Sequence, residues 1–346
     1  MIRERLTSQL LAGPPVRDPV SVVRRLLAVQ GQDPRGFRLA VRARSSGLSA
    51  ADVDRALTDD RSLVVTWLNR GTLHLVCSED YPWLQALTAP RLFKGTAQHL
   101  ANDGVEAAAA ERGVSVIERS LASEGPLTRG QLRERIAAAK ISTAGQALGH
   151  LLLLSNLRGV AVRGPMVGRE HAYVLVRDWL SEPVAVDRDR ALAELARRYL
   201  AGHGPAGDRD LARWSGLTLG DARAGLGAIA AELSVRTDGL LTLRGKPPAA
   251  ELPPPRLLGA FDPVLLGWSS REAVLGADRV IATVNGLFRP FALVAGRAAG
   301  TWSMPAGEVV LEPFGRLARA DRAALAADAA DVARYLGVTS ASVKPS

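Results

Sequence analysis

Apolar residues recur at helical spacing over most of the first two thirds of the chain, and short strand-like stretches separate the helical groups. The last third predicts strands followed by one amphipathic helix. The apolar face of that helix carries Leu317, Leu325, Val332 and Leu336. The pattern therefore predicts an α+β protein that is mainly helical.

Two Gly-Pro steps mark an internal repeat. Gly204-Pro205 lies 79 positions after Gly125-Pro126, and each step follows a Leu-Ala pair at the same distance. Proline ends a helix because it lacks the amide hydrogen and clashes with the preceding turn. Each copy then predicts two further helices and a strand pair, at 159–163 with 171–176 and at 233–236 with 240–243. Three helices closed by a two-stranded wing form a winged helix-turn-helix unit.

The N-terminal part predicts a third, diverged copy that lacks the Gly-Pro step. Its helices are expected at 3–11, 19–29, 34–44 and 50–57, and its hairpin at 63–67 and 72–76, turned at Asn69-Arg70-Gly71. The expected domains are 1–100, 101–180 and 181–245 as winged-helix units, 246–255 as a proline-rich linker, and 256–346 as a small β-rich, barrel-like module. The strands of that module are expected at 280–284, 291–294, 298–302 and 309–312.

The composition narrows the class of protein. A chain of 346 residues, 47% of them hydrophobic, has material for two or three domains. It has no apolar run near 20 residues and no basic-then-apolar N-terminal segment, so we expect a cytoplasmic monomer, associated with the nucleoid if bacterial, without a membrane span or signal peptide. A single cysteine, Cys77, excludes an internal disulfide, and the histidines lack metal-ligand spacing. We expect neither a metal nor another cofactor.

The charge balance favours a polyanionic partner without proving one. The chain has 44 basic and 35 acidic residues, a formal net charge of +9. A sequence-reading regulator would present polar side chains on the third helix of each repeat. These helices, near 146–154 and 218–233, are instead rich in Leu, Ala and Gly, with Arg223 as the one base of the second. The repeats therefore predict a buried scaffold.

The stretch Val29-Gln30-Gly31-Gln32-Asp33-Pro34 is the strongest candidate for chemistry. Two side chains two positions apart face the same way only in an extended segment, and we expect Gly31 to end the preceding helix. Asp33 with Pro34 predicts the cap of the next helix. Gln30 and Gln32 would then face one pocket, or else would only support a turn through hydrogen bonds to the backbone.

Several stretches carry a resemblance to a known family: 29–44, 50–57, 66–76, 260–263, 288–290 and 300–302. Together they resemble the AlkZ/YcaQ family of winged-helix DNA glycosylases over nearly the whole chain. That family excises alkylated bases, including bulky adducts and interstrand crosslinks, with a Gln-x-Gln or Gln-x-Asp motif. The resemblance implies that Gln30 and Gln32 are catalytic. The family usually has an aliphatic residue between the two, where this chain has Gly31.

Uncharged amides suit that chemistry. A purine alkylated on a ring nitrogen is cationic, so its glycosidic bond breaks to release a neutral base without a strong acid. The protein then has to place a water molecule and orient dipoles beside the developing sugar cation. The resemblance thus implies a monofunctional glycosylase acting on double-stranded DNA. The alternative is a non-catalytic winged-helix DNA-binding or regulatory protein.

Basic residues near the motif are candidates for nucleic-acid binding. Arg35, Arg38 and Arg42 recur at helical spacing, which fits either phosphate contacts or a solvated helix face. Arg70 and His74 belong to the first hairpin, where the histidine also suits a structural, hydrogen-bonded role. Arg271 and Arg289 are candidates by position alone.

Overall fold

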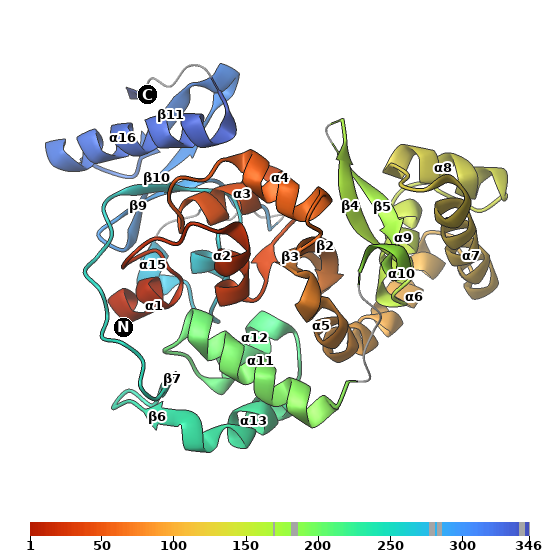
Figure 1. The fold of residues 1–346 in the computed structure, drawn as a ribbon, viewed down its shortest axis with the longest axis horizontal. Coiled ribbons are helices and arrows are strands. Elements are labelled where there is room, and N and C mark those ends of the chain that lie inside the picture. Colours follow the sequence, from red (N-terminus) through yellow and green to blue (C-terminus); the bar gives the residue numbers. More distant parts are fainter. Residues whose placement is uncertain (169, 181–185, 277–280, 282–285, 339–342, 346) are drawn as a thin grey trace. The chain divides into compact units, whose positions relative to one another are not determined.

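The computed structural model describes residues 1–168, 170–180, 186–276, 281, 286–338 and 343–345 (Figure 1). The chain forms two compact units. Unit 1 comprises Met1–Val53, Leu192–Trp214 and Thr218–Ser346, and unit 2 comprises Asp54–Ala191 and Ser215–Leu217. The units interrupt one another along the chain, whereas the five domain ranges expected from the sequence are continuous and stay a prediction.

The N-terminal part of the chain follows the predicted order of helices. Its elements are α1 (Ile2–Ser8), α2 (Pro19–Leu26), β1 (Val29–Gln30), α3 (Pro34–Arg42) and α4 (Ala50–Thr58). Asp18 caps α2 by accepting hydrogen bonds from the backbone N–H groups of Val20 and Ser21. The helix expected at 19–29 is therefore present but three residues shorter.

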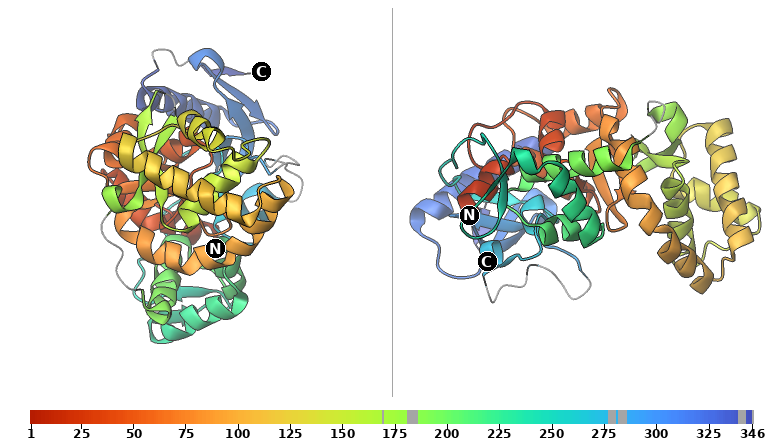
Figure 2. Two further views of the ribbon diagram at one scale, coloured as in Figure 1. Left: turned by 90° about the vertical axis from the view of Figure 1, so that its right-hand side faces the viewer. Right: turned by 90° about the horizontal axis from the view of Figure 1, so that it is seen from below.

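Unit 2 holds an antiparallel group of strands in the order β3-β2-β4-β5. Its elements are β2 (Leu63–Leu68), β3 (Thr72–Cys77), η1 (Ser78–Asp80), α5 (Tyr81–Thr88), η2 (Ala89–Arg91), α6 (Phe93–Asn102), α7 (Ala107–Glu124), α8 (Arg129–Ala138), α9 (Ala147–Leu157), β4 (Ala161–Val167), β5 (Glu170–Leu175) and α10 (Val176–Trp179). Figures 1 and 2 show α7, α8 and α9 packed beside β4 and β5. As predicted, α9 is buried, and its leucines join the core of this unit.

The second copy of the repeat has the same order of elements as the first. It consists of α11 (Arg188–His203), α12 (Asp208–Ser215), α13 (Leu219–Ala228), η3 (Ala230–Glu232), β6 (Leu233–Val235) and β7 (Leu241–Leu243). A threonine begins a helix with a capping box in each copy: Thr128 with Gln131 before α8, and Thr218 with Asp221 before α13. The stretch from Arg244 to Pro255 forms neither helix nor strand, and Arg256 begins the next sheet.

The C-terminal sheet has the strand order β12-β11-β10-β9-β8. Its elements are β8 (Arg256–Leu258), α14 (Pro263–Leu266), α15 (Glu272–Leu275), β9 (Phe291–Val294), β10 (Arg297–Ser303), η4 (Pro305–Gly307), β11 (Val309–Pro313), α16 (Arg319–Leu336) and β12 (Val343–Pro345). Among the described residues, no pairing joins the edge strands β8 and β12. The sheet is therefore open, and the barrel-like closure expected from the sequence is wrong. The strand expected at 280–284 falls outside the described residues except for Ile281.

The last helix covers this sheet, as its amphipathic pattern predicts. Leu325 and Val332 of α16 pack with Trp302 of β10 and Leu311 of β11 in one buried cluster. The chain is thus a helix-rich α+β protein with mainly antiparallel sheets, in which β11 and β12 pair in parallel. Within the described residues, no helix is both long and apolar enough to cross a membrane.

Candidate active site

The two glutamines stand on an extended segment between α2 and α3. The preceding helix ends at Leu26, because Leu27 adopts φ +65°, and Val29–Gln30 is extended as β1. The backbone thus leaves the helix four residues before Gly31, and the expectation that Gly31 ends the helix is wrong. Asp33 accepts a hydrogen bond from the Arg35 backbone N–H at 3.0 Å and caps α3, as predicted.

The extended backbone brings both amides to the same side. Gln30 Nε2 donates a hydrogen bond to Gln32 Oε1 at 2.6 Å. The Gln30 side chain is buried, at 7% exposure, whereas Gln32 is exposed. An amide group has two donor hydrogens and an oxygen with two lone pairs, so this bond leaves polar capacity on both side chains. The buried glutamine fixes the orientation of the exposed one.

The three arginines after the motif do not share one exposed face. Arg35 is exposed, and its guanidinium donates to Met304 Sδ and lies 5.8 Å from the Trp302 ring. Partial burial lowers the pKa of Arg35. Arg38 is buried, with Nη1 donating to the Pro34 carbonyl at 2.7 Å.

Arg42 is buried in a structural network. Its guanidinium lies 2.7 Å from an Asp328 oxygen and 3.1 Å from an Asp331 oxygen, and it donates to the Leu257 carbonyl at 3.0 Å. These partners lie on β8 and α16. Helical spacing fitted either a phosphate contact or a solvated helix face for Arg42, and its side chain makes neither because it is buried inside unit 1.

Sequence reasoning missed the residues that fix α3 in place. Arg44 and Asp262 form an ion pair at 2.8 Å in which both side chains have no exposure. Gly36 packs so closely that an added Cβ would lie 2.5 Å from the Ala260 carbonyl oxygen. The signal in the sequence was Asp262-Pro263, the same Asp-Pro cap that begins α2 and α3.

Arg70 and His74 belong to unit 2, where Arg70 is exposed at the turn of the β2–β3 hairpin. His74 is 3% exposed, and its Nδ1–H donates to the Thr72 carbonyl at 2.8 Å. Burial, followed by the nearby Arg70 charge, lowers the pKa of His74 to about 3. The imidazole is therefore neutral at physiological pH, in line with a structural role.

Arg271 and Arg289, the two C-terminal candidates for nucleic-acid binding, differ in exposure. Arg271 is half-buried, with Nε donating to the Leu265 carbonyl at 2.9 Å and its guanidinium 5.0 Å from the Phe288 ring. Burial lowers the pKa of Arg271, and the charge of Arg213 acts in the same direction. Arg289 is exposed.

One group of side chains in the described residues has the spacing of metal ligands. Ligand atoms of Cys77, Glu79 and Asp80 lie within 4.8 Å of one another. Asp80 already accepts a hydrogen bond from Trp83 Nε1 at 3.1 Å, which gives this carboxylate a structural role.

The sequence matches the family described as DNA glycosylase AlkZ-like over residues 23–335, so the chain belongs to that family. It is a DNA glycosylase, an enzyme that hydrolyses N-glycosidic bonds, and its substrate is DNA. The chain is 30% identical to the interstrand DNA cross-link repair glycosylase of Streptomyces sahachiroi, over 92% of this chain and 91% of that protein. The solved structure of the Streptomyces sahachiroi DNA glycosylase AlkZ matches it with a TM-score of 0.79 at 26% identity, covering 100% of this chain and 98% of that one.

Proposed function

We propose that this glycosylase excises cationic, alkylated purines, including bulky adducts and interstrand crosslinks, with Gln30 and Gln32 as its catalytic residues. The observation that carries the proposal is the hydrogen-bonded amide pair, buried at Gln30 and exposed at Gln32. The name of the Streptomyces sahachiroi relative supports crosslinks as substrates. The fixed direction of the exposed amide is what water placement needs.

The reaction needs no proton donor on the base. The C1′–N9 bond breaks, and its electron pair neutralises the positive charge of the alkylated purine. Gln32 Oε1, which already accepts from Gln30, has a second lone pair that receives a hydrogen of the attacking water. The water oxygen bonds to C1′ and releases a proton to solvent. The amide dipoles stabilise the sugar cation through electrostatics rather than proton transfer.

The rest of the fold acts as scaffold and DNA-binding surface in this proposal. We infer that the two repeats are winged-helix units, supported by three helices and a strand pair in each. Arg35, Arg70 and Arg289 remain candidate phosphate contacts because they are exposed. Arg38, Arg42, His74 and Arg271 act as structural residues, since burial and protein hydrogen bonds occupy them. The proposal places one copy of the chain on double-stranded DNA.

The competing role for the pair is structural, because a Gln30–Gln32 hydrogen bond is also what a turn support makes. Single-turnover excision separates the two. Duplex DNA with one N7-methylguanine is incubated with excess protein, and abasic sites are cleaved with alkali. We expect strand breaks whose rate falls about 10²-fold or more in Gln30→Ala and in Gln32→Ala, as for loss of an oriented catalytic dipole.

Gln98→Ala is the matched control, because Gln98 is an exposed glutamine whose amide donates to Asn102. Its excision rate should equal that of the wild type. DNA binding measured in parallel should be unchanged in all three variants. Undiminished excision in both glutamine variants would instead show that the pair only supports the turn.

A further inference from the structure

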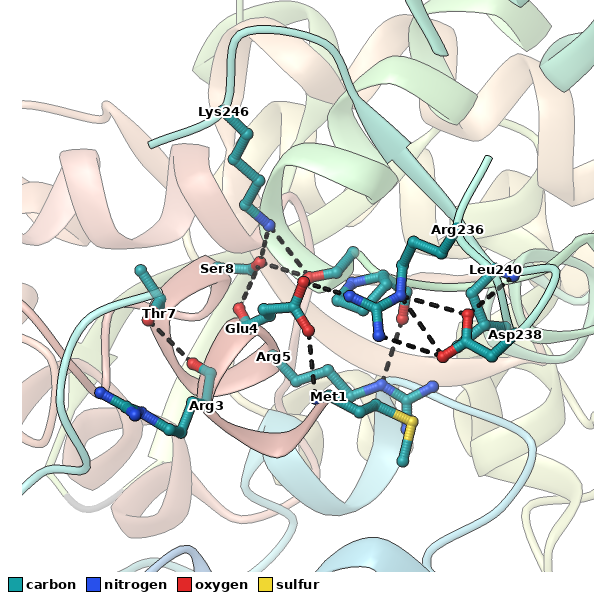
Figure 3. A network of polar contacts seen from close by, with 12 residues as sticks. Met1, Arg3, Glu4, Arg5, Thr7, Ser8, Arg236, Asp238, Leu240 and Lys246 are labelled. Carbon is teal, nitrogen blue, oxygen red and sulfur yellow. Dashed lines mark hydrogen bonds and ion pairs between the residues drawn. The ribbon is translucent and has the colours of Figure 1, made fainter. Parts of the chain in front are cut away.

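Lys246 stands at the start of the proline-rich linker, and its ammonium is partly buried against α1. It donates hydrogen bonds to Ser8 Oγ and to the Gly204 carbonyl at 3.0 Å (Figure 3). Ser8 is fully buried and itself donates to the Glu4 carbonyl at 2.8 Å. Both acceptors of the ammonium are neutral groups.

The charge of Lys246 is not balanced by the protein. Within the described residues, no carboxylate lies at ion-pair distance from its Nζ. Glu4 is the nearest acid to act on it, but Glu4 is engaged by Arg236 and by the Met1 amino group at 3.0 Å (Figure 3). Burial, followed by repulsion from Arg25, lowers the pKa of Lys246 to about 8. A partly buried cation with no carboxylate at ion-pair distance among the described residues is what an anion-binding site requires.

Lys246 is one of the residues that line a cavity of about 280 Å³. Lys246 and Arg244 supply positive charge to it, and Pro247 and Pro248 stiffen one wall. Its hydroxyl groups come from α1 and from both strands of the second repeat's hairpin, namely Thr7, Ser234 and Thr242. Glu4 also lines the cavity, with its charge compensated by Arg236. The Thr7 hydroxyl already donates to the Arg3 carbonyl at 2.8 Å, so the two cations and the hydroxyls of Ser234 and Thr242 are the donors for the acceptor oxygens of a phosphate group.

The site belongs to the same part of unit 1 as the glutamines. Arg25, which interacts electrostatically with Lys246, is the next-to-last residue of α2, and Gln30 follows five residues later. Five residues span at most about 18 Å. That length corresponds to about five base-pair steps of duplex DNA.

We propose that the cavity between α1, the β6–β7 hairpin and the linker binds a backbone phosphate of the DNA substrate, with Lys246 as the principal cation and Arg244 as the second. The inference rests on the proposed function, since it takes the bound strand to be the one presented to Gln30 and Gln32.

The salt dependence of DNA binding tests the proposal. Each neutralised phosphate contributes about 0.9 to the slope of log affinity against log salt concentration. Binding of undamaged duplex to the full-length protein is measured from low to moderate salt. Lys246→Met should lower the slope by about 0.9, Lys246→Arg should keep it, and Arg244→Gln should reduce it. Lys140→Met, at an exposed lysine of unit 2, is the matched control. An unchanged slope in Lys246→Met overturns the proposal.

The pH dependence of DNA binding, which reports proton uptake by Lys246, gives a second readout. A lysine with a merely structural role would not affect it. An anion favours the protonated form of Lys246, so wild-type affinity should fall between pH 7 and pH 9.5. Glu4, Arg25, Arg244 and the neutral His203 are the other ionisable groups that face it. Lys246→Arg should abolish that fall because a guanidinium stays charged. If Lys246→Met fails to fold, the other two variants still test the site. An unaltered pH profile in Lys246→Arg together with an unaltered slope in Arg244→Gln refutes it.

Competition by inorganic phosphate at constant ionic strength separates the two sources of the phosphate group. Weak competition that disappears in Lys246→Met supports a DNA phosphate at this cavity. Saturable phosphate binding at Lys246 together with unaltered DNA binding in Lys246→Met assigns the cavity to a free phosphate and overturns the proposal.

The test is also independent of catalysis. The salt slope is measured on undamaged duplex, so it does not depend on excision. A slope change without excision in the wild type would sink the proposed catalysis and leave the phosphate site standing. Excision by the wild type together with an unaltered slope in Lys246→Met would support the proposed catalysis and overturn the phosphate site.

Discussion

At the scale of single residues, two buried arginines fix the helix that follows the glutamines. Arg42 pairs with Asp328 and Asp331 of α16, and Arg44 pairs with Asp262 before α14. Their acidic partners lie more than 200 positions away in the chain. Helical spacing identifies Arg42 as one member of a stripe, but it cannot tell that this face of α3 is buried. The arginines that follow the glutamines most closely in the sequence are therefore the site residues whose roles were least predictable.

Loss of the Arg44 charge should destabilise the protein strongly. Arg44→Met leaves the carboxylate of Asp262 buried without its partner, which costs about 3–5 kcal/mol. Urea unfolding should show this loss, and the double variant Arg44→Met/Asp262→Asn should recover part of it. Arg135→Met, which breaks an exposed pair with Glu124, should change stability little. Equal losses in both single variants would contradict this account.

His203 should make unit 1 sensitive to acid. Its ring stacks on Tyr199 at 5.0 Å, and neither ring nitrogen has a well-formed hydrogen bond among the described residues. Burial lowers the pKa of His203 to about 3, below its value of 6.5 in the unfolded chain. The unfolded state therefore binds the proton first. The full stability is present above pH 6.5 and is lost as the pH falls toward 3, by about 1.4 kcal/mol per unit.

The replacement His203→Phe should remove that dependence while keeping the aromatic contacts. Urea unfolding of both proteins at pH 7.5 and pH 5.5 measures it. The wild type should lose about 1.4 kcal/mol more than the variant on this change of pH. The same loss in both proteins would show that His203 is not the group responsible.

At the scale of elements, the close approach of α3 to the segment before α14 sets the position of the motif. A Cβ on Gly36 would meet the Ala260 carbonyl, and a Cβ on Gly259 would lie 2.9 Å from the Gly36 carbonyl. Two backbones can come this close only without side chains. Helix α3, which Asp33 caps, is therefore fixed in position by the segment before α14, in the C-terminal part of unit 1.

Gly36→Ala should thus push α3 away and disturb Gln32. Overpacking of this kind costs about 1–3 kcal/mol, and excision should slow as well. Gly227→Ala in α13 is the matched control, since its Cβ would meet nothing within 4 Å. That variant should gain about 0.5–1 kcal/mol, as for alanine in place of glycine in a helix. Thermal unfolding and the N7-methylguanine assay measure both effects, and equal behaviour of the two variants would refute the packing argument.

The elements themselves were largely predictable from the sequence. Apolar periodicity and Gly-Pro steps located the helices of both repeats, the Asp33-Pro34 cap located the start of α3, and the strand pairs followed from alternation. The end of α2 was not predictable, because Leu27 adopts a positive φ that leucine rarely takes. The open C-terminal sheet was missed because strand patterns do not specify whether the first and last strands pair. Lys246 gave no local signal, since its neighbours come from α1 and the end of α11.

At the scale of the whole molecule, α16 completes the core of unit 1. It supplies Leu325 and Val332 to the cluster that contains Leu39 of α3, and Asp328 to Arg42. The glutamine segment is thus built on contacts made by the last helix of the described chain.

Removal of residues 319–346 should therefore unfold unit 1 and leave unit 2 folded. Limited proteolysis with mass spectrometry should show cleavage within 1–53 and 256–318, while 107–175 stays protected by its own core. Asp328→Ala should give a milder loss of protection, and Arg322→Ala, at an exposed position of α16, should give none. Protection of both units in the truncated protein would contradict this role of α16.

The interrupted course of unit 1 also orders events during synthesis on the ribosome. The glutamine segment emerges early, but Asp262 and Asp328 follow only after more than 200 further residues. At translation rates of about 5–20 residues per second, the segment waits roughly 15–55 seconds for these partners. Unit 2, made almost entirely in between, has its core complete first. Nascent chains should consequently carry no excision activity until α16 has been made.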